Sequence, residues 1–116
     1  MAKPFEELSG LDRLIHEPAR LAILTALAAC YSCDFLYLQS LTGITKGNLS
    51  NHLLKLEEAG LVHIKKGYKG RVPRTTLQLT QRGRTAIDEH WRRLDELRSA
   101  ADTWQSRQKL ARTGRS

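Results

Sequence analysis

The sequence predicts a mainly α-helical domain with a small β-hairpin, an α+β arrangement. Apolar residues recur at three- and four-residue spacing before Gly60 and after Thr80, whereas the residues between them alternate, and glycines and a proline divide that alternating stretch. A chain of 116 residues has room for one hydrophobic core and little room for a second. We therefore expect one domain over residues 1–104.

Two helices are predicted near the N-terminus. Ser9 and Asp12 form a variant of the capping box, and a short helix through Leu11, Leu14 and Ile15 would follow. Pro18 is tolerated in the first turn of the next helix, which we expect to run from about Pro18 to Cys30. The apolar residues that mark this helix are Leu21, Ile23, Leu24, Leu27 and Ala28.

Two further helices are joined by a tight turn at residues 42–44. Asp34 is a suitable N-cap for the first, and Gly43 can end it in a left-handed conformation. Thr45 is a suitable N-cap for the second, and Gly60 can end it. The buried faces are marked by Phe35, Leu38 and Leu41 in the first helix and by Leu49, Leu53 and Leu56 in the second.

After Gly60 the apolar period changes from helical to alternating. Residues 61–66 alternate, and residues 75–80 place Leu77 and Leu79 on one face, so both stretches predict strands. The glycines and the proline of residues 67–74 predict a hairpin loop between them.

Thr80 is expected to cap a long final helix. Its narrow apolar stripe consists of Ile87, Trp91, Leu94, Leu97, Ala101 and Trp104. Residues 105–116 carry four cations, no acidic residue and few large apolar groups, which predicts a frayed basic tail.

Positive charge is concentrated in one segment. The chain carries 19 Lys and Arg against 12 Asp and Glu, a formal net charge of +7. No acidic residue lies between Ala59 and Ile87, and this stretch holds Lys65, Lys66, Lys69, Arg71, Arg74, Arg82 and Arg84. Such a concentration attracts a polyanion, of which nucleic acid is the commonest example. A solvated basic face is the alternative.

Candidate metal and catalytic groups are few. Cys30 and Cys33 form a C-x-x-C pair, but a zinc site needs two more suitably spaced ligands, and the four histidines are scattered singly. We expect reduced, partly buried thiols, with a redox or metal-sensing role as the alternative. Because no Ser-His-Asp, Cys-His or paired-carboxylate arrangement stands out, we expect neither a cofactor nor enzyme activity.

The sequence also predicts a soluble, cytoplasmic protein. No apolar run approaches the roughly 18 residues that a membrane span requires. Residues 1–10 are too polar and too acidic for a signal peptide. We therefore expect no association with a membrane.

The predicted order of helix, helix, turn, helix, basic hairpin and helix is that of a helix-turn-helix followed by a wing. A helix fits the major groove of DNA, while the adjacent hairpin reaches phosphates or the minor groove. Burial of the three leucines after Thr45 leaves an outward face of Thr45, Lys46, Gly47, Asn48, Ser50, Asn51 and Lys55. These side chains can read base edges and phosphates, and a glycine permits close backbone approach. An ordinary polar helix surface is the alternative.

The candidate wing carries the cations Lys65, Lys66, Lys69, Arg71 and Arg74 beside Tyr68 and Pro73. Contacts with phosphates would fix the position of the protein on the duplex, and an arginine at the tip could enter a narrow minor groove. Lysines that only prevent strand pairing at a sheet edge are the alternative.

Four segments carry a resemblance: residues 16–24 (HEPARLAIL), 47–53 (GNLSNHL), 56–62 (LEEAGLV) and 66–75 (KGYKGRVPRT), the last followed by Leu79, Thr80 and Gly83. Together they resemble stand-alone winged-helix DNA-binding transcriptional regulators of the broad MarR/ArsR type, over about residues 11–94. The resemblance implies a homodimer that places each recognition helix in a major groove of operator-like DNA. The chain lacks the cysteine pair that metal-sensing members carry on that helix, which argues against metal regulation.

Terminal helices are expected to form a two-fold dimer, because large exposed apolar side chains usually mark interfaces. The predicted interface residues are Phe5, Leu8, Ile87, Trp91, Leu94, Leu97 and Trp104. Such a dimer would hold two recognition helices about 34 Å apart, one turn of DNA. Packing of the tryptophans within one monomer is the alternative.

The sequence thus predicts a sequence-specific regulator of transcription that binds double-stranded DNA, with repression favoured. The recognition helix would read the major groove, and the wing would contact the minor groove or phosphates. A winged-helix adaptor for other proteins and a sequence-independent chromatin protein are the alternatives.

Overall fold

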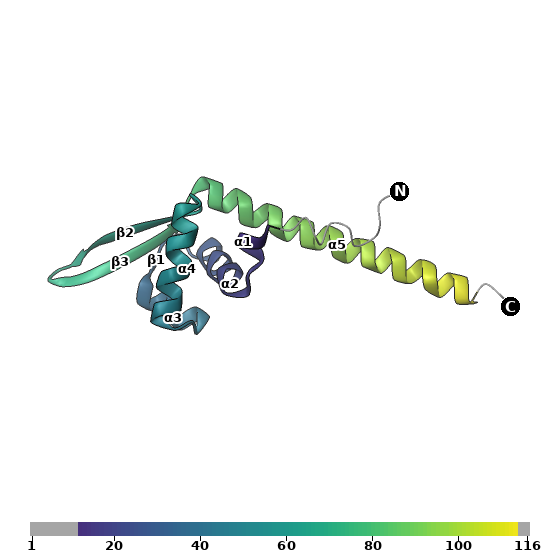
Figure 1. Ribbon diagram of the computed structural model, residues 1–116, viewed down its shortest axis with the longest axis horizontal. Helices are drawn as coiled ribbons and strands as arrows, with labels where there is room; N and C mark the ends of the chain where they lie inside the picture. The colour runs from purple at the N-terminus through teal and green to yellow at the C-terminus, as the bar shows by residue number, and fades with distance from the viewer. Residues whose placement is uncertain (1–11, 114–116) are drawn as a thin grey trace. The chain divides into compact units, whose positions relative to one another are not determined.

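The computed structural model describes residues 12–113, in which five helices and three strands are formed (Figure 1). In chain order they are α1 (Arg13–His16), α2 (Pro18–Ala29), β1 (Cys33–Asp34), α3 (Phe35–Thr42), α4 (Lys46–Glu58), β2 (Val62–Lys69), β3 (Val72–Leu79) and α5 (Gln81–Thr113). The chain forms two compact units. Residues 13–88 make one unit, and the described part of the other is Asp12 with residues 89–113 of α5.

The predicted fold class is confirmed, since the chain is mostly helical and carries one small antiparallel sheet. The predicted boundaries of α3 also agree with the structure. The amide of Tyr37 donates to the Asp34 carboxylate at 2.7 Å, and Gly43 follows the helix with a φ of 70°. The Ser9 cap predicted for α1 lies outside the described residues.

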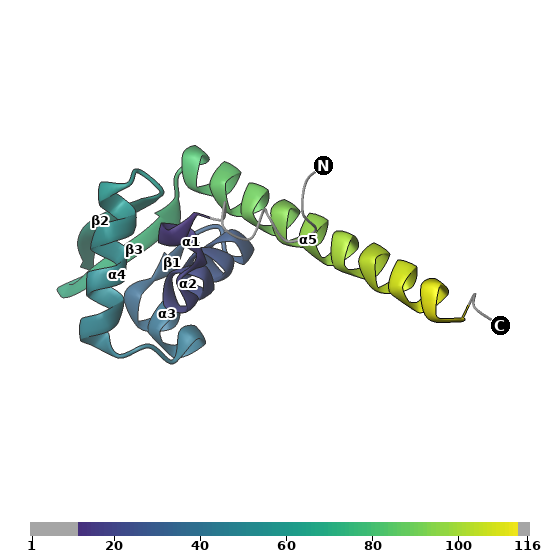
Figure 2. The ribbon, with the colours of Figure 1, turned by 45° about the vertical axis from the view of Figure 1, so that its right-hand side comes forward.

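The core of the unit formed by residues 13–88 lies between its helices and the sheet. Its fully buried side chains are Ile23, Leu24, Leu27, Leu38, Leu49, Leu53, Leu56, Leu77 and Ile87. Figures 1 and 2 show α4 beside α3 and α2, and Figure 1 shows the β2–β3 hairpin extending beyond the helices. The leucines of α4 form one buried stripe, which fixes the rotation of this helix about its axis.

Ile87 corrects one prediction. We expected this side chain at a dimer interface, but it has no exposed surface and belongs to the core of residues 13–88. The first turns of α5 belong to the same unit as the core, so an apolar residue there is buried within the chain. The apolar stripe of α5 therefore has two uses, and only its part beyond Asp88 remains available for an interface.

The sheet has the strand order β1-β3-β2, with both pairings antiparallel. The strand β1 was not predicted, because two residues carry no detectable alternation. It pairs Cys33 with Leu77 and Asp34 with Thr76. This pairing places the N-cap of α3 directly beside the central strand.

The hairpin is longer than predicted. We expected residues 67–74 to form a loop, but the ladder continues to the pair Lys69 and Val72, so Gly70 and Arg71 alone make the turn. Gly70 has a φ of 65°, whereas no described residue other than glycine has a positive φ. These conformations match a type II′ turn with glycine at its first central position. The turn places Arg71 at the tip of the hairpin.

The C-terminal helix is also longer than predicted. We expected a frayed tail from residue 105, but α5 continues without a break to Thr113. That prediction is wrong over residues 105–113. These residues are mostly Gln, Arg, Lys, Leu and Ala, which favour helix, and no glycine or proline occurs between Gly83 and Gly114.

The start of α5 packs tightly on the chain that leaves α4. Thr80 caps the helix as predicted, since its Oγ1 accepts from the Gly83 amide at 2.9 Å and donates to the Gly60 carbonyl at 2.6 Å. A Cβ at Gly83 would fall on the carbonyl oxygen of Leu61 and lie 2.9 Å from its carbonyl carbon. A glycine at position 83 is therefore a condition for this packing.

We expect Gly83→Ala to lower the free energy of unfolding by about 3 kcal/mol, because the new methyl group overlaps backbone that cannot move freely. Gly47→Ala is the matched control, since a Cβ there meets nothing within 4 Å, and helix propensity favours alanine by up to about 1 kcal/mol. Urea unfolding followed by circular dichroism measures both. Equal stability of Gly83→Ala and the parent chain would contradict the packing described.

Candidate nucleic-acid interface

The helix α4 presents the candidate recognition residues from its first turn onward. Thr45 caps the helix as predicted, since its Oγ1 accepts from the Asn48 amide at 3.4 Å. The exposed candidates are Thr45, Lys46, Gly47, Asn48, Asn51 and Lys55, while Ser50 is half-buried. Successive residues of a helix are turned by about 100°, so these candidates do not all share one face.

Two adjacent faces of α4 are exposed beside its buried stripe. Gly47, Asn48, Asn51 and Lys55 lie together on the face opposite the core, which we call the outward face. Lys46, Ser50 and Leu54, spaced by four residues, form a flank that borders the hairpin. The structure thus separates the predicted residues into an outward set and a flanking set.

Gly47 lies on the outward face without an internal reason to be glycine. Its backbone does not have a positive φ, and a Cβ at this position would meet nothing within 4 Å. Within a helix, glycine costs roughly 0.5–1 kcal/mol relative to alanine. Packing within the chain therefore does not require a glycine at position 47.

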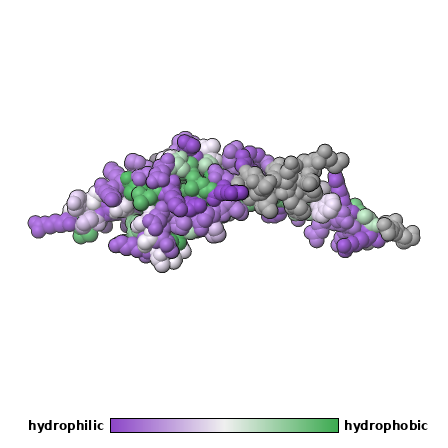
Figure 3. Space-filling model, in the orientation of Figure 1, coloured by the Kyte–Doolittle hydropathy of each residue, from purple (hydrophilic) through white to green (hydrophobic). Residues whose placement is uncertain are grey.

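The hairpin distributes its cations over both faces and its tip. Residues paired directly across an antiparallel ladder point to the same side. Lys66, opposite Thr75, shares the face of buried Leu77, whereas Lys65 and Arg74 lie on the other face. All five candidate wing cations are exposed, and Figure 3 shows the free end of the hairpin as mostly hydrophilic surface.

Arg74 differs from the other wing cations because it has an acidic partner. Its Nη2 lies 3.6 Å from the Oδ2 of Asp34, the residue that also caps α3. A partly exposed ion pair of this kind contributes about 0–1 kcal/mol to stability, so its main effect is to orient the Arg74 side chain toward α3. Arg74 is therefore less available to a phosphate than Arg71 at the tip.

The arrangement of α4 beside a basic hairpin matches a known family. Residues 19–98, more than half of the chain, match the family model described as a winged helix DNA-binding domain. The chain belongs to this winged-helix family. The β2–β3 hairpin is accordingly the wing of this fold, and α4 is the candidate recognition helix.

Individual proteins are also similar to this chain. An uncharacterized protein of Methanocaldococcus jannaschii is 39% identical over 79 residues, which cover 67% of this chain and 85% of that protein. The structure of a transcriptional regulator homologue from Pyrococcus horikoshii OT3 is 32% identical, covers 85% of this chain and 97% of that chain, and has a TM-score of 0.70. The family to which the chain belongs is one of DNA-binding regulators and not of enzymes.

A MarR-family transcriptional regulator from Silicibacter pomeroyi shares the fold. It is 24% identical with a TM-score of 0.60, and the match covers 95% of this chain and 73% of that chain. The predicted winged-helix class of MarR type is therefore confirmed at the level of fold. Among residues 12–113, no helix has the length and apolar character to cross a bilayer.

A polar cluster missed by the sequence analysis holds the recognition helix against α2. The Nη1 of Arg20 lies 3.3 Å from the Nδ1 of His52, and its Nε donates to the carbonyl of Leu14 at 2.6 Å. Glu17 caps α2 by accepting from the Arg20 amide at 2.9 Å, and it lies 3.7 Å from His52. The cluster borders α4 on the side away from Lys46, Ser50 and Leu54.

The position of Glu17 changes its acidity. Burial alone would raise the pKa of its carboxyl, but hydrogen bonds from the Arg20 and Ala19 amides and the neighbouring His52 and Arg20 outweigh burial. The pKa of Glu17 is therefore lowered below its ordinary value of 4.5. A sequence signal did exist, since a glutamate directly before a proline at a helix start is a possible cap.

The two cysteines are free thiols, as expected, with Cys30 half-buried and Cys33 buried. Burial raises the pKa of the Cys33 thiol to about 11, and Cys30 and Asp34 add to this effect. Because this pKa lies well above 7, the Cys33 thiol is protonated at neutral pH. In the described part of the chain, no three His, Cys, Asp or Glu residues are grouped to hold a metal ion.

The predicted interface residues fall into three groups. Phe5 and Leu8 lie outside the described residues, and Ile87 is in the core. Trp91 and Trp104 are 42% and 45% exposed, while Leu94 and Leu97 are half-buried. The two tryptophans therefore keep large apolar surface in contact with solvent.

We expect Glu17→Ala to lower the free energy of unfolding by about 1 kcal/mol near pH 7, the usual cost of losing a helix cap. Because folding lowers the pKa of Glu17, its stabilisation is complete above the unfolded value of 4.5 and is lost as the pH falls through the folded value. The difference from the parent chain should shrink in acid. Urea titrations between about pH 3 and pH 7, with exposed Glu58→Ala as control, measure it. A difference that is constant with pH would contradict this role.

Proposed function

We propose that the chain is a sequence-specific transcriptional regulator that binds double-stranded DNA as a homodimer. The observation that carries the proposal is the outward face of α4, where an open glycine and two exposed asparagines lie beside an acid-free wing. Asparagine can bond adenine bidentately in the major groove, and cations at the wing neutralise phosphates. The recognition helix would read bases, and the wing would contact phosphates or the minor groove.

Repression in the cytoplasm is the regulatory outcome we propose. A compact dimer bound to an operator that overlaps a promoter blocks access to that promoter by its own volume. Transcription of a reporter placed behind the selected site would fall in the presence of the protein if this proposal is right. A rise in transcription would instead identify an activator.

Dimerisation is proposed through the C-terminal part of α5. From Leu94 to Ala111, one side of this helix repeats at alternating spacings of three and four residues: Leu94, Leu97, Ala101, Trp104, Gln108 and Ala111. This 3.5-residue average is the repeat of helices that pack as coiled coils. The partly exposed Trp104 supports a partner of the same chemistry, which a second copy of the chain supplies.

Selection of bound fragments from genomic DNA, followed by titrations at several salt concentrations, tests DNA binding. We expect Arg71→Ala to weaken binding to all sequences and to reduce the salt slope by about one, because it removes a phosphate or minor-groove contact. Asn51→Ala should cost about 1–3 kcal/mol on the selected site and little on random DNA. If both variants titrate like the parent chain, this surface does not bind DNA. Equal affinity of the parent chain for selected and random DNA would favour a chromatin protein.

We expect Trp104→Glu to convert a dimer at micromolar concentration into a monomer, because a carboxylate would be buried in an apolar seam. Operator affinity should fall at least tenfold, since one recognition helix would bind alone. Thr103→Glu is the control, as Thr103 is exposed and adjacent to the repeat. Sedimentation equilibrium gives the mass. A monomeric parent chain would refute the dimer and leave DNA binding by the single domain open to the titrations.

A further inference from the structure

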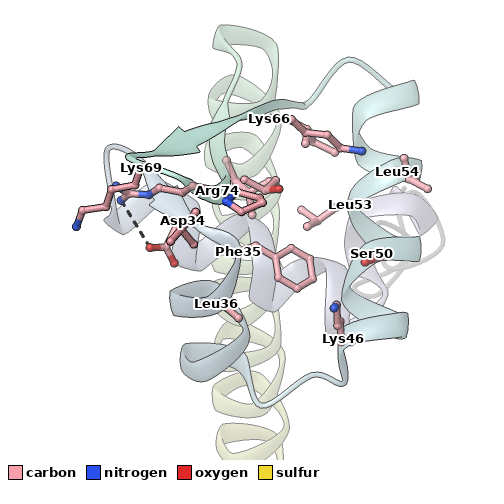
Figure 4. A pocket seen from close by; sticks show the side chains of 15 residues that line it. Asp34, Phe35, Leu36, Lys46, Ser50, Leu53, Leu54, Lys66, Lys69 and Arg74 are labelled. Atoms are coloured by element: carbon pink, nitrogen blue, oxygen red, sulfur yellow. Dashed lines mark ion pairs between the residues drawn. The ribbon is translucent and has the colours of Figure 1, made fainter.

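Asp34 uses each oxygen of its carboxylate for a different part of the unit formed by residues 13–88. Its Oδ1 accepts from the Tyr37 amide at 2.7 Å and so caps α3. Its Oδ2 lies 3.6 Å from the Nη2 of Arg74 in the wing, an ion pair that Figure 4 shows as a dashed line. The backbone of Asp34 is held as well, because β1 pairs this residue with Thr76. The carboxylate is therefore anchored independently of Arg74.

Arg74, in contrast, has room to leave this ion pair. Its side chain is 45% exposed. Gly67 lies directly opposite Arg74 in the ladder and carries no side chain, and a Cβ at Gly67 would meet nothing within 4 Å. A hollow of about 340 Å³ is lined by both residues. The guanidinium can therefore turn away from Asp34 without displacing a neighbouring side chain.

The face of the wing that carries Arg74 is basic. Lys65 pairs with Thr76 and Lys69 pairs with Val72, so both lysines are diagonal neighbours of Arg74 on the same side of the ladder. The wing itself contains no acidic residue, and Asp34 reaches it from β1. Asp34 therefore neutralises one of the three cations that this face would otherwise offer to an anion.

We propose that Asp34 competes with the phosphates of bound DNA for Arg74, and so weakens the part of DNA binding that does not depend on sequence. A carboxylate and a phosphate offer the guanidinium similar oxygens. Because the cap bond anchors the carboxylate, Arg74 must leave Asp34 to reach a duplex. Only the difference between the two ion pairs then adds to affinity. The competition with DNA rests on the proposed function, whereas the retention of Arg74 against other polyanions does not.

Asp34→Asn tests the proposal, because asparagine caps a helix about as well as aspartate and lacks the charge. On random duplex DNA we expect binding about threefold to tenfold tighter and a salt slope steeper by about one per subunit, since Arg74 then contacts a phosphate. Glu58→Gln is the matched control, an exposed carboxylate of the same unit, and should change affinity by less than about twofold. Anisotropy of labelled DNA gives the affinities, and urea unfolding checks that the variants are folded.

A double-mutant cycle separates the release of Arg74 from the general effect of removing one negative charge. In the Arg74→Gln background, Asp34→Asn should tighten binding by less than about twofold. An equal gain in both backgrounds, or no gain when Arg74 is present, would overturn the proposal. A parent chain that binds neither selected nor random DNA would refute the proposed function instead. The same cycle with heparin, a polyanion without bases, then decides the role of Asp34: a gain that requires Arg74 supports it, and any other result overturns it.

Discussion

The burial of one stripe of α4 is the constraint on which the functional surface depends. Leu49, Leu53 and Leu56 are fully buried, so the helix cannot rotate about its axis without exposing large apolar side chains. This burial therefore fixes the direction in which each of the other α4 side chains faces. The residues at roughly 180° to the leucines face outward, those toward the hairpin border a groove, and His52, on the third side, meets Arg20.

Much of this could be predicted from the sequence, because the decisive signals are local. Thr45, Thr80 and Gly43 each act within one turn of a helix, and all three caps occur as expected. The features that were missed depend on contacts between distant residues. The strand β1 exists only because Cys33 meets Leu77, and Ile87 is buried only because the start of α5 packs into the core unit. Periodicity shows that a residue is apolar on one face, but it does not show which partner covers that face.

The extended hairpin is a second case in which local sequence signals did not predict the structure. Gly67 and Pro73 lower strand propensity, so the sequence favoured a loop over residues 67–74. A type II′ turn at Gly70 and Arg71 matches the twist of paired strands, and it lets the ladder persist to Lys69 and Val72. Turn geometry therefore outweighed the local preference of two residues. The hairpin therefore extends beyond the helices of residues 13–88 (Figure 1), and Arg71 lies in its turn.

Two glycines differ in whether packing within the chain requires them. Gly83 is dictated by the fold, since a side chain there would overlap the backbone of Leu61. Gly47 meets no such obstacle, yet it weakens the helix that carries the candidate recognition residues. A residue that lowers local stability and relieves no internal contact is expected where another molecule must come close to the backbone. Gly47, two residues after the cap Thr45 and beside Asn48 and Asn51, has this property on the outward face.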